Sequence, residues 1–145
     1  MDIKLKELFN FDVNEKYDLT DKNILCNHNI YFPLDVVKYL MENDYKVDEN
    51  TFYSAIDNCD IDMFTFLFYE GCPYDKYSTY SAAYCGVLRL LEIMMELNYV
   101  KKDENNHWIK TKINQNHFIF NNELLETARQ GGCPDCIEYI QEILE

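Results

Sequence analysis

The apolar and polar positions along the chain predict a series of short amphipathic helices. In residues 34–43 the apolar side chains form one broad helical face, with Asp35, Lys38 and Glu42 largely on the other side. Residues 51–75 have the pattern of two short helices, each followed by a turn, and residues 78–100 and 123–144 repeat that pattern. The sequence therefore predicts an all-α fold, interrupted by one insertion.

The predicted helices recur with a period of 27 residues. Leu40, Leu67 and Met94 are separated by that step. Two further apolar series keep the same spacing: Val37, Phe64 and Leu91, and Tyr39, Phe66 and Ile93. Ile137 follows Leu91 by 46 residues, so about 19 inserted residues are expected before the last unit. Helix pairs of this size bury their apolar faces only against neighbouring pairs, which predicts a stack.

The scarce small residues follow the same period. All four alanines stand where the first helix of a unit must approach its neighbour, at positions 55, 82, 83 and 128. Gly71, Gly86 and Gly132 stand at predicted turns, where glycine supplies the left-handed conformation that other residues resist. Thr51 and Ser78 are expected to cap the first helices of two units, and residue 21, an aspartate, to cap that of an earlier one.

Length and period together predict one domain. A chain of 145 residues has the size of a single domain, and its 48% hydrophobic content is sufficient for a packed core. The expected parts are an N-terminal cap at 1–20, repeats at 21–48, 49–75 and 76–102, an insertion at 103–121, and a last repeat with the C-terminal cap at 122–145. Glu138, Glu142 and Glu145 are expected to face water on the closing helix.

The insertion breaks the period, and its pattern predicts a β-hairpin. Residues 107–113 and 117–120 alternate apolar and polar side chains on either side of an Asn-Gln-Asn turn. The segment holds the only tryptophan, Trp108, and with its flank four of the thirteen basic residues: Lys101, Lys102, Lys110 and Lys112. Insertions in repeat proteins often lie on the binding face. The alternative is a strand pair that only shields the third repeat.

The helix pairs and their turns resemble ankyrin repeats, in the 27-residue form abundant in large DNA viruses of amoebae. The most specific element is GCPYD, from Gly71 to Asp75. The other matching residues are Leu34, Val37, Lys38, Tyr39, Leu40, Glu42, Asn43, Thr51, Ala55, Leu67, Ala82, Ala83, Gly86, Leu88, Leu91, Ala128, Gly132, Cys136 and Tyr139. The resemblance covers about 21–102 and 122–145, and implies an ankyrin-repeat solenoid that binds a viral or host protein.

The chain departs from the ankyrin pattern at two kinds of position. The histidine that follows the turn glycine is replaced by Asp60, Val87 and Cys133, and Cys59 replaces one turn glycine. The family tolerates such changes, so the expected fold is unaffected, whereas the helix ends are less closely defined by the pattern. If the chain is viral, the resemblance implies a location in the host cytoplasm or in the virion.

Charge and hydropathy exclude several kinds of partner. The net charge of −13 argues against direct nucleic-acid binding, because phosphate contacts need a basic face. No apolar run approaches the roughly 18 residues that a membrane span needs, and the N-terminus lacks the apolar core of a secretory signal. An intracellular location is therefore expected, with the six cysteines as reduced thiols.

Cys133 and Cys136 have the C-x-x-C spacing of redox and zinc sites. A redox site needs a β-α-β context that the pattern does not predict. For zinc, His107 and His117 could complete four ligands, but their spacing matches no common finger, and Cys136 falls on a core position of the repeat. No phosphate-binding glycine loop, G-x-S-x-G or HExxH motif is found. We therefore expect no enzyme, no cofactor and no small-molecule substrate.

A protein partner is the expected ligand, because an extended rigid array offers a large binding surface. Candidate contacts lie in the turns at 47–50 and 74–77, on the adjacent first helices and in the insertion. They are Val47, Glu49, Asn50, Asp57, Asn58, Tyr74, Lys76, Tyr77, Tyr84 and Trp108. Tyrosine and tryptophan anchor many interfaces, although a codon bias toward Asn, Tyr, Ile and Lys also accounts for the twelve tyrosines.

Two other functions stay open at this point. One is a structural or virion-associated component that assembles with itself or with a scaffold, which predicts a stoichiometric oligomer at micromolar concentration. The other is an acidic mimic that blocks the nucleic-acid-binding site of a basic protein. Binding of the second kind would collapse between low and moderate salt. Net charge is the only support for the mimic.

Overall fold

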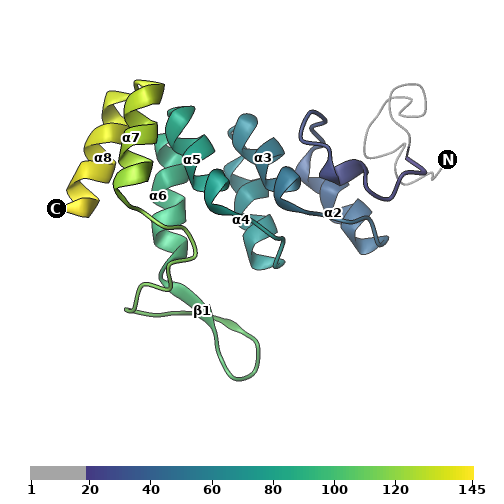
Figure 1. Ribbon diagram of the computed structural model, residues 1–145. Coiled ribbons are helices and arrows are strands. Elements are labelled where there is room, and N and C mark those ends of the chain that lie inside the picture. The colour runs from purple at the N-terminus through teal and green to yellow at the C-terminus, as the bar shows by residue number, and fades with distance from the viewer. Residues whose placement is uncertain (1–18) are drawn as a thin grey trace.

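The computed structural model describes residues 19–145, so nearly all of the predicted N-terminal cap at 1–20 lies outside the described residues. The described part is mostly helical, with one two-stranded antiparallel sheet. Its elements are η2 (Ile24–Cys26), α2 (Leu34–Glu42), α3 (Glu49–Asp57), α4 (Ile61–Tyr69), α5 (Lys76–Tyr84), α6 (Leu88–Leu97), β1 (Val100–Lys102), β2 (Trp108–Lys110), α7 (Asn122–Gly131) and α8 (Pro134–Leu144). Figure 1 shows the helices as pairs in a row, following the order of the chain, with the hairpin projecting from that row below α6.

Asp48, Asp75 and Asn121 begin the first helix of three successive pairs. The carboxylate of Asp48 accepts from the Asn50 amide at 2.9 Å, and that of Asp75 from the Tyr77 amide at 3.0 Å. Asn121 stands 46 residues after Asp75 and accepts from the backbone amide at position 124 at 2.9 Å. These side chains satisfy amides that the first turn of a helix leaves without a partner. The caps therefore follow the period of the sequence.

The prediction that Thr51 and Ser78 cap these helices is wrong. Both lie three residues inside the helix and are buried. The Thr51 hydroxyl donates to the carbonyl of residue 25 at 2.8 Å and accepts from the Asp48 amide at 3.1 Å. Asp21 does accept from the amide two residues later, at 2.9 Å, but only the short 3₁₀ helix η2 follows it. Carboxylates thus hold the cap positions of α3 and α5, and the Thr51 hydroxyl contacts the previous unit instead.

Left-handed backbone also recurs at the expected spacing. Asp44 and Gly71, which are 27 residues apart, have φ of 68° and 79° in the turns after α2 and α4. Cys59 and Gly86 have the same spacing with φ of 51° and 73°, and Gly132 follows with φ of 76°. A left-handed residue other than glycine costs about 1–2 kcal/mol. The chain therefore turns in the same way even where Asp44 and Cys59 replace glycine.

Burial repeats with the same period. Leu40, Leu67, Met94 and Ile140 are all 0% exposed, and Ile140 follows Met94 by 46 residues. They belong to one continuous core cluster that also contains the four alanines of the first helices, all buried as expected. As the sequence predicts, Glu138 and Glu142 on α8 and Glu145 directly after it are exposed. Successive helix pairs therefore share one apolar core.

The helices α5 and α7 approach each other closely at Gly131. A Cβ atom added there would lie 2.2 Å from the carbonyl oxygen of Tyr84 and 2.8 Å from its Cα. Helix propensity alone favours alanine over glycine by about 1 kcal/mol, but this contact is with backbone, which cannot rotate away. We expect Gly131→Ala to lower the free energy of unfolding by about 1–3 kcal/mol, as measured by urea unfolding.

The matched control for this change is Gln130→Ala, on the exposed side of the same turn. We expect that variant to stay within about 0.5 kcal/mol of the unchanged chain, because it alters no buried contact. A Gly131→Ala protein as stable as the control would contradict the close approach of α5 and α7.

The hairpin lies earlier in the chain than the sequence pattern predicts. Strand β1 pairs antiparallel with β2, with Val100 opposite Lys110 and Lys102 opposite Trp108. Asp103 closes the turn, because its carboxylate accepts from the amides of residues 105 and 107 at 2.9 Å each. Residues 117–120, predicted as the second strand, are not a strand. The first strand therefore comes from the segment that was expected to end the third repeat.

Asn98 explains why the 117–120 segment does not pair as a strand. Its side-chain amide donates to the Phe118 carbonyl at 2.7 Å and accepts from the Phe118 amide at 2.7 Å. Asn98 and Phe118 are each 1% exposed. The amide group of Asn98 thus takes the place of a strand partner, while the Phe118 ring enters the core.

Candidate functional site

The outward side of α3, α5 and α7 forms a continuous surface, which we call the first-helix face. Helix α3 packs on α5, and α5 packs on α7. Equivalent residues are 27 positions apart between α3 and α5, and 46 apart between α5 and α7 because of the insertion. The face consists of Asn50, Tyr53, Asp57, Tyr77, Tyr80, Tyr84, Glu123, Glu126 and Gln130. Tyr77 and Tyr84 are 55% and 57% exposed, more than any other aromatic side chain in residues 19–145.

A depression of about 340 Å³ lies on the N-terminal half of this face. It is lined by His28, Asn50, Tyr53, Asp57 and Ser81. These residues come from the loop after η2, from α3 and from α5, so three successive units contribute to it. The depression is large enough for a side chain of another molecule, and both acidic and aromatic groups border it.

Hydrogen bonds between tyrosines and carboxylates connect successive helix pairs, one of them from Tyr53 on the face. The Tyr53 hydroxyl donates to Asp75 at 2.6 Å, and the Tyr31 hydroxyl donates to Asp60 at 2.7 Å. The hydrogen bond to Asp60, together with burial, raises the pKa of Tyr31 to about 12. Burial and the bond to Asp75 also raise the pKa of Tyr53. Both hydroxyls therefore stay protonated at neutral pH and link one helix pair to the next.

The structure brings together part of the predicted contact set. Asn50, Asp57, Tyr77 and Tyr84 all lie on the first-helix face. Glu49 and Lys76 begin α3 and α5 beside it, and the Lys76 ammonium lies 5.3 Å from the Tyr77 ring. Two residues have structural contacts instead: Val47 is half-buried against the core, and Asn58 donates to the Ser54 carbonyl at the end of α3.

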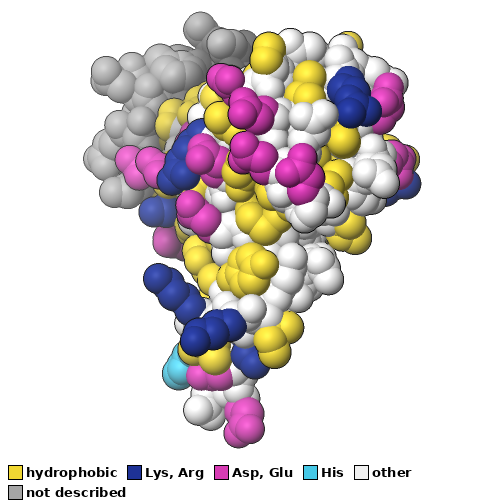
Figure 2. Space-filling view, turned by 90° about the vertical axis from the view of Figure 1, so that its left-hand side faces the viewer, with side chains coloured by type: hydrophobic (Ala, Val, Ile, Leu, Met, Phe, Trp, Pro, Cys, Tyr) yellow, Lys and Arg dark blue, Asp and Glu magenta, His cyan; other side chains and the backbone are white. Residues whose placement is uncertain are grey.

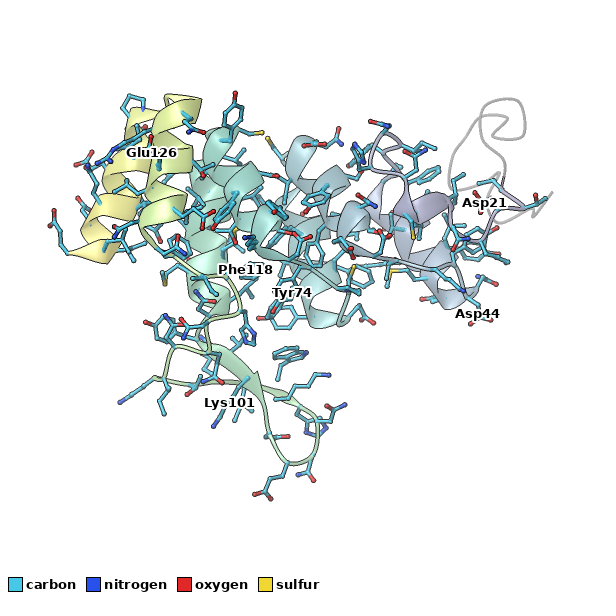
Figure 3. All side chains as sticks on the ribbon, in the orientation of Figure 1. Asp21, Asp44, Tyr74, Lys101, Phe118 and Glu126 are labelled. Atoms are coloured by element: carbon cyan, nitrogen blue, oxygen red, sulfur yellow. The ribbon has the colours of Figure 1, made fainter. Side chains whose placement is uncertain are left out.

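Tyr74 and Trp108 lie elsewhere, in an aromatic cluster under the insertion. The Tyr74 ring stacks on Phe118 with centroids 4.7 Å apart, as Figure 3 shows between the helix row and the hairpin. Trp108 packs on Phe68 at 5.1 Å and donates from its indole nitrogen to the Tyr69 carbonyl at 3.1 Å. The prediction that Tyr74 faces outward is therefore wrong, because the insertion covers it.

Tyr53, Tyr80, Ser81 and His28 belong to the face or its depression and were not among the predicted contacts. The sequence contained a signal for Tyr53 and Tyr80, which are 27 residues apart. Tyr53 lies at helical spacing between the predicted contacts Asn50 and Asp57, and Tyr80 lies in the same way between Tyr77 and Tyr84. His28 gave no such signal, since its loop contributes to the depression only through the stacking of η2 on α3.

All six cysteines lie in the described range and are free thiols. Burial raises the pKa of Cys72 to about 12 and, with the neighbouring Cys133, that of Cys136 to about 12. Cys136 is fully buried, as its repeat position predicts. Within residues 19–145, no three side chains of His, Cys, Asp or Glu are grouped to hold a metal ion. Cys133, Cys136, His107 and His117 are therefore not gathered into one ligand set.

Comparison of the chain with protein-family models, with curated proteins and with solved structures gave no match. Nor does any helix in the described part of the chain combine the length and the apolar composition needed to cross a bilayer. The first-helix face spans three consecutive helices, α3, α5 and α7, in the described part of the chain.

Proposed function

We propose that the chain is a non-enzymatic protein-interaction module, built as an ankyrin-repeat stack, which binds a viral or host protein through the first-helix face. The main support is the exposure of Tyr77 and Tyr84, two turns apart on α5, beside the depression lined by Tyr53 and Asp57. A single exposed aromatic is ordinary. Two on one helix, with a concave site next to them, match the anchors of protein interfaces.

The ankyrin part of the proposal is supported by three local features with one period. The caps at Asp48 and Asp75, the left-handed turns at Cys59 and Gly86, and the buried series from Leu40 to Met94 all recur at 27 residues. Repeat stacks of this kind distribute stability over neighbouring units and leave the outer side of one helix row available for partners.

The proposal is tested by changing both exposed tyrosines. We expect the Tyr77→Ala, Tyr84→Ala double variant to bind its partner at least about tenfold more weakly, because interface anchors contribute more than about 1 kcal/mol each. Partners captured from host or infected cells are identified by mass spectrometry, and affinity is then measured with the purified partner. Tyr74 and Trp108 stay unchanged, because their substitution would disturb the aromatic cluster.

A second double variant, Ile113→Ala with Ile119→Ala, is the matched control, because these side chains are 70% and 53% exposed on the insertion. We expect it to retain the partner. Retention of every specific partner by the tyrosine variant would rule out the first-helix face. A stoichiometric oligomer in light scattering at micromolar concentration would instead favour the structural alternative, a component that assembles with itself.

A further inference from the structure

The insertion creates a second concave site that shares no residue with the first-helix face. A cavity of about 510 Å³ lies between α4, α6 and the hairpin. Its apolar lining includes Tyr69, Ile93, Leu97, Tyr99 and Val100, and Lys110 stands at its border. This volume and this mainly apolar lining are typical of pockets that hold a ligand or a partner's side chain.

Hydrogen bonds fix the walls of the cavity before any partner arrives. The indole of Trp108 donates to the Tyr69 carbonyl at 3.1 Å, which holds the hairpin beside α4. The Thr111 amide donates to the Tyr99 carbonyl at 2.9 Å, which holds β2 beside the end of α6. The side-chain amide of Asn98 binds the backbone of Phe118, and so holds the end of the insertion against the helices. A site that is already ordered loses little conformational entropy on binding.

The insertion, which forms one wall of the cavity, carries a charge opposite to that of the whole chain. Residues 99–121 contain four lysines and two acidic residues, a net charge of +2, whereas the whole chain carries −13. Figure 2, a view onto the C-terminal end, shows basic side chains gathered on the hairpin and acidic ones over the helices above it. Salt screens charges over about 8 Å at physiological ionic strength, so distant acidic residues on the helices contribute little at the cavity. Its own charged lining residues are Lys110 and Glu96.

Glu96 is the acidic residue that lines the cavity. The guanidinium of Arg89 lies 3.6 Å from its carboxylate, with both side chains largely exposed. This neighbour offsets part of the negative charge on that side. Lys110 is exposed at the border and has no such acidic neighbour among the described ion pairs. Lys110 is therefore the basic side chain of the cavity lining that a partner's carboxylate can pair with.

We propose that this cavity binds an acidic segment of a partner protein, with a bulky apolar side chain in the cavity and an Asp or Glu carboxylate at Lys110. The apolar lining selects the side chain, and Lys110 selects the charge. This is an interaction surface additional to the first-helix face, and it does not depend on that face. A nucleic acid fits less well, because phosphates make no use of an apolar cavity and few lysines are available for them.

The test uses a library of random short peptides, selected against the immobilised full chain. We expect the recovered peptides to be enriched in Asp and Glu around a bulky apolar residue. Their affinity is then measured by fluorescence polarisation for two variants. Lys110→Glu reverses the charge at the border, and Thr65→Phe fills the cavity from α4. Each is expected to weaken binding roughly tenfold, and the unchanged protein should bind more weakly as salt rises.

Lys46→Glu makes the same charge change at an exposed position outside the cavity lining, and is expected to leave affinity within about twofold. The Tyr77→Ala, Tyr84→Ala variant should also bind normally, so failure here is distinguishable from failure of the first-helix face. The proposal is overturned if no peptide is recovered, if the peptides lack acidic residues, or if Lys110→Glu and Thr65→Phe bind as well as the unchanged chain. Displacement of the peptide by a single-stranded oligonucleotide, or by a second copy of the chain, would also overturn it.

Discussion

Leu67→Ala is expected to lower the free energy of unfolding by about 2–5 kcal/mol, the largest single effect that we predict for the helix pairs. Leu67 is 0% exposed and belongs to the core cluster, in the middle of the series formed with Leu40 and Met94. Removing the methine carbon and the two methyl groups of Leu67 leaves a cavity between neighbouring pairs, which rigid helices cannot close fully. Urea unfolding followed by circular dichroism measures the loss.

The control for this prediction is Ile113→Ala, which removes a similar apolar group at a position that is 70% exposed. It is expected to change stability by less than about 0.5 kcal/mol. If Leu67→Ala cost no more than this control, the second helices would not share a continuous core, and the stacked arrangement would have to be abandoned.

Asn98→Ala is expected to lower the free energy of unfolding by about 2–5 kcal/mol, because the Phe118 amide and carbonyl each lose a buried hydrogen-bond partner worth about 1–3 kcal/mol. Both residues are 1% exposed, so water cannot readily replace the lost amide group. The insertion should also become mobile, since Asn98 fixes its return to the core. Urea unfolding and hydrogen exchange at the Phe118 amide measure the two effects.

The fluorescence of Trp108, the single tryptophan, reports independently on whether the hairpin stays packed against the helices. We expect its emission to shift toward that of a solvated indole in Asn98→Ala, as the hairpin leaves Phe68 and Tyr69. Asn105→Ala, in the exposed hairpin turn, is the control and should leave emission and exchange unchanged. A Phe118 amide that stays as protected in Asn98→Ala as in the unchanged chain would contradict the role assigned to Asn98.

Residue spacing alone was enough to predict the main helices and the central buried positions. The 27-residue spacing of Leu40, Leu67 and Met94 predicted equivalent buried positions, and each is fully buried. Gly71 and Gly86 predicted the left-handed turns that the backbone adopts. These features can be predicted from the sequence because each depends on side chains within one helical turn or at the 27-residue spacing. A helix needs an apolar face at its own spacing, and every repeat meets the same packing problem as the last.

The caps, the strand pairing and the surroundings of the aromatic residues depend on contacts between segments far apart in the chain. Asp48 and Thr51 are both good caps by residue type, and their places depend on the carbonyl of the previous pair that Thr51 reaches. The hairpin position depends on Asn98, which is 20 residues from its partner Phe118. Tyr74 and Tyr77 are the same residue type and lie three positions apart, yet the insertion covers Tyr74 whereas Tyr77 is exposed. Contacts across such distances leave no periodic trace in the sequence, because any of several residues could make them.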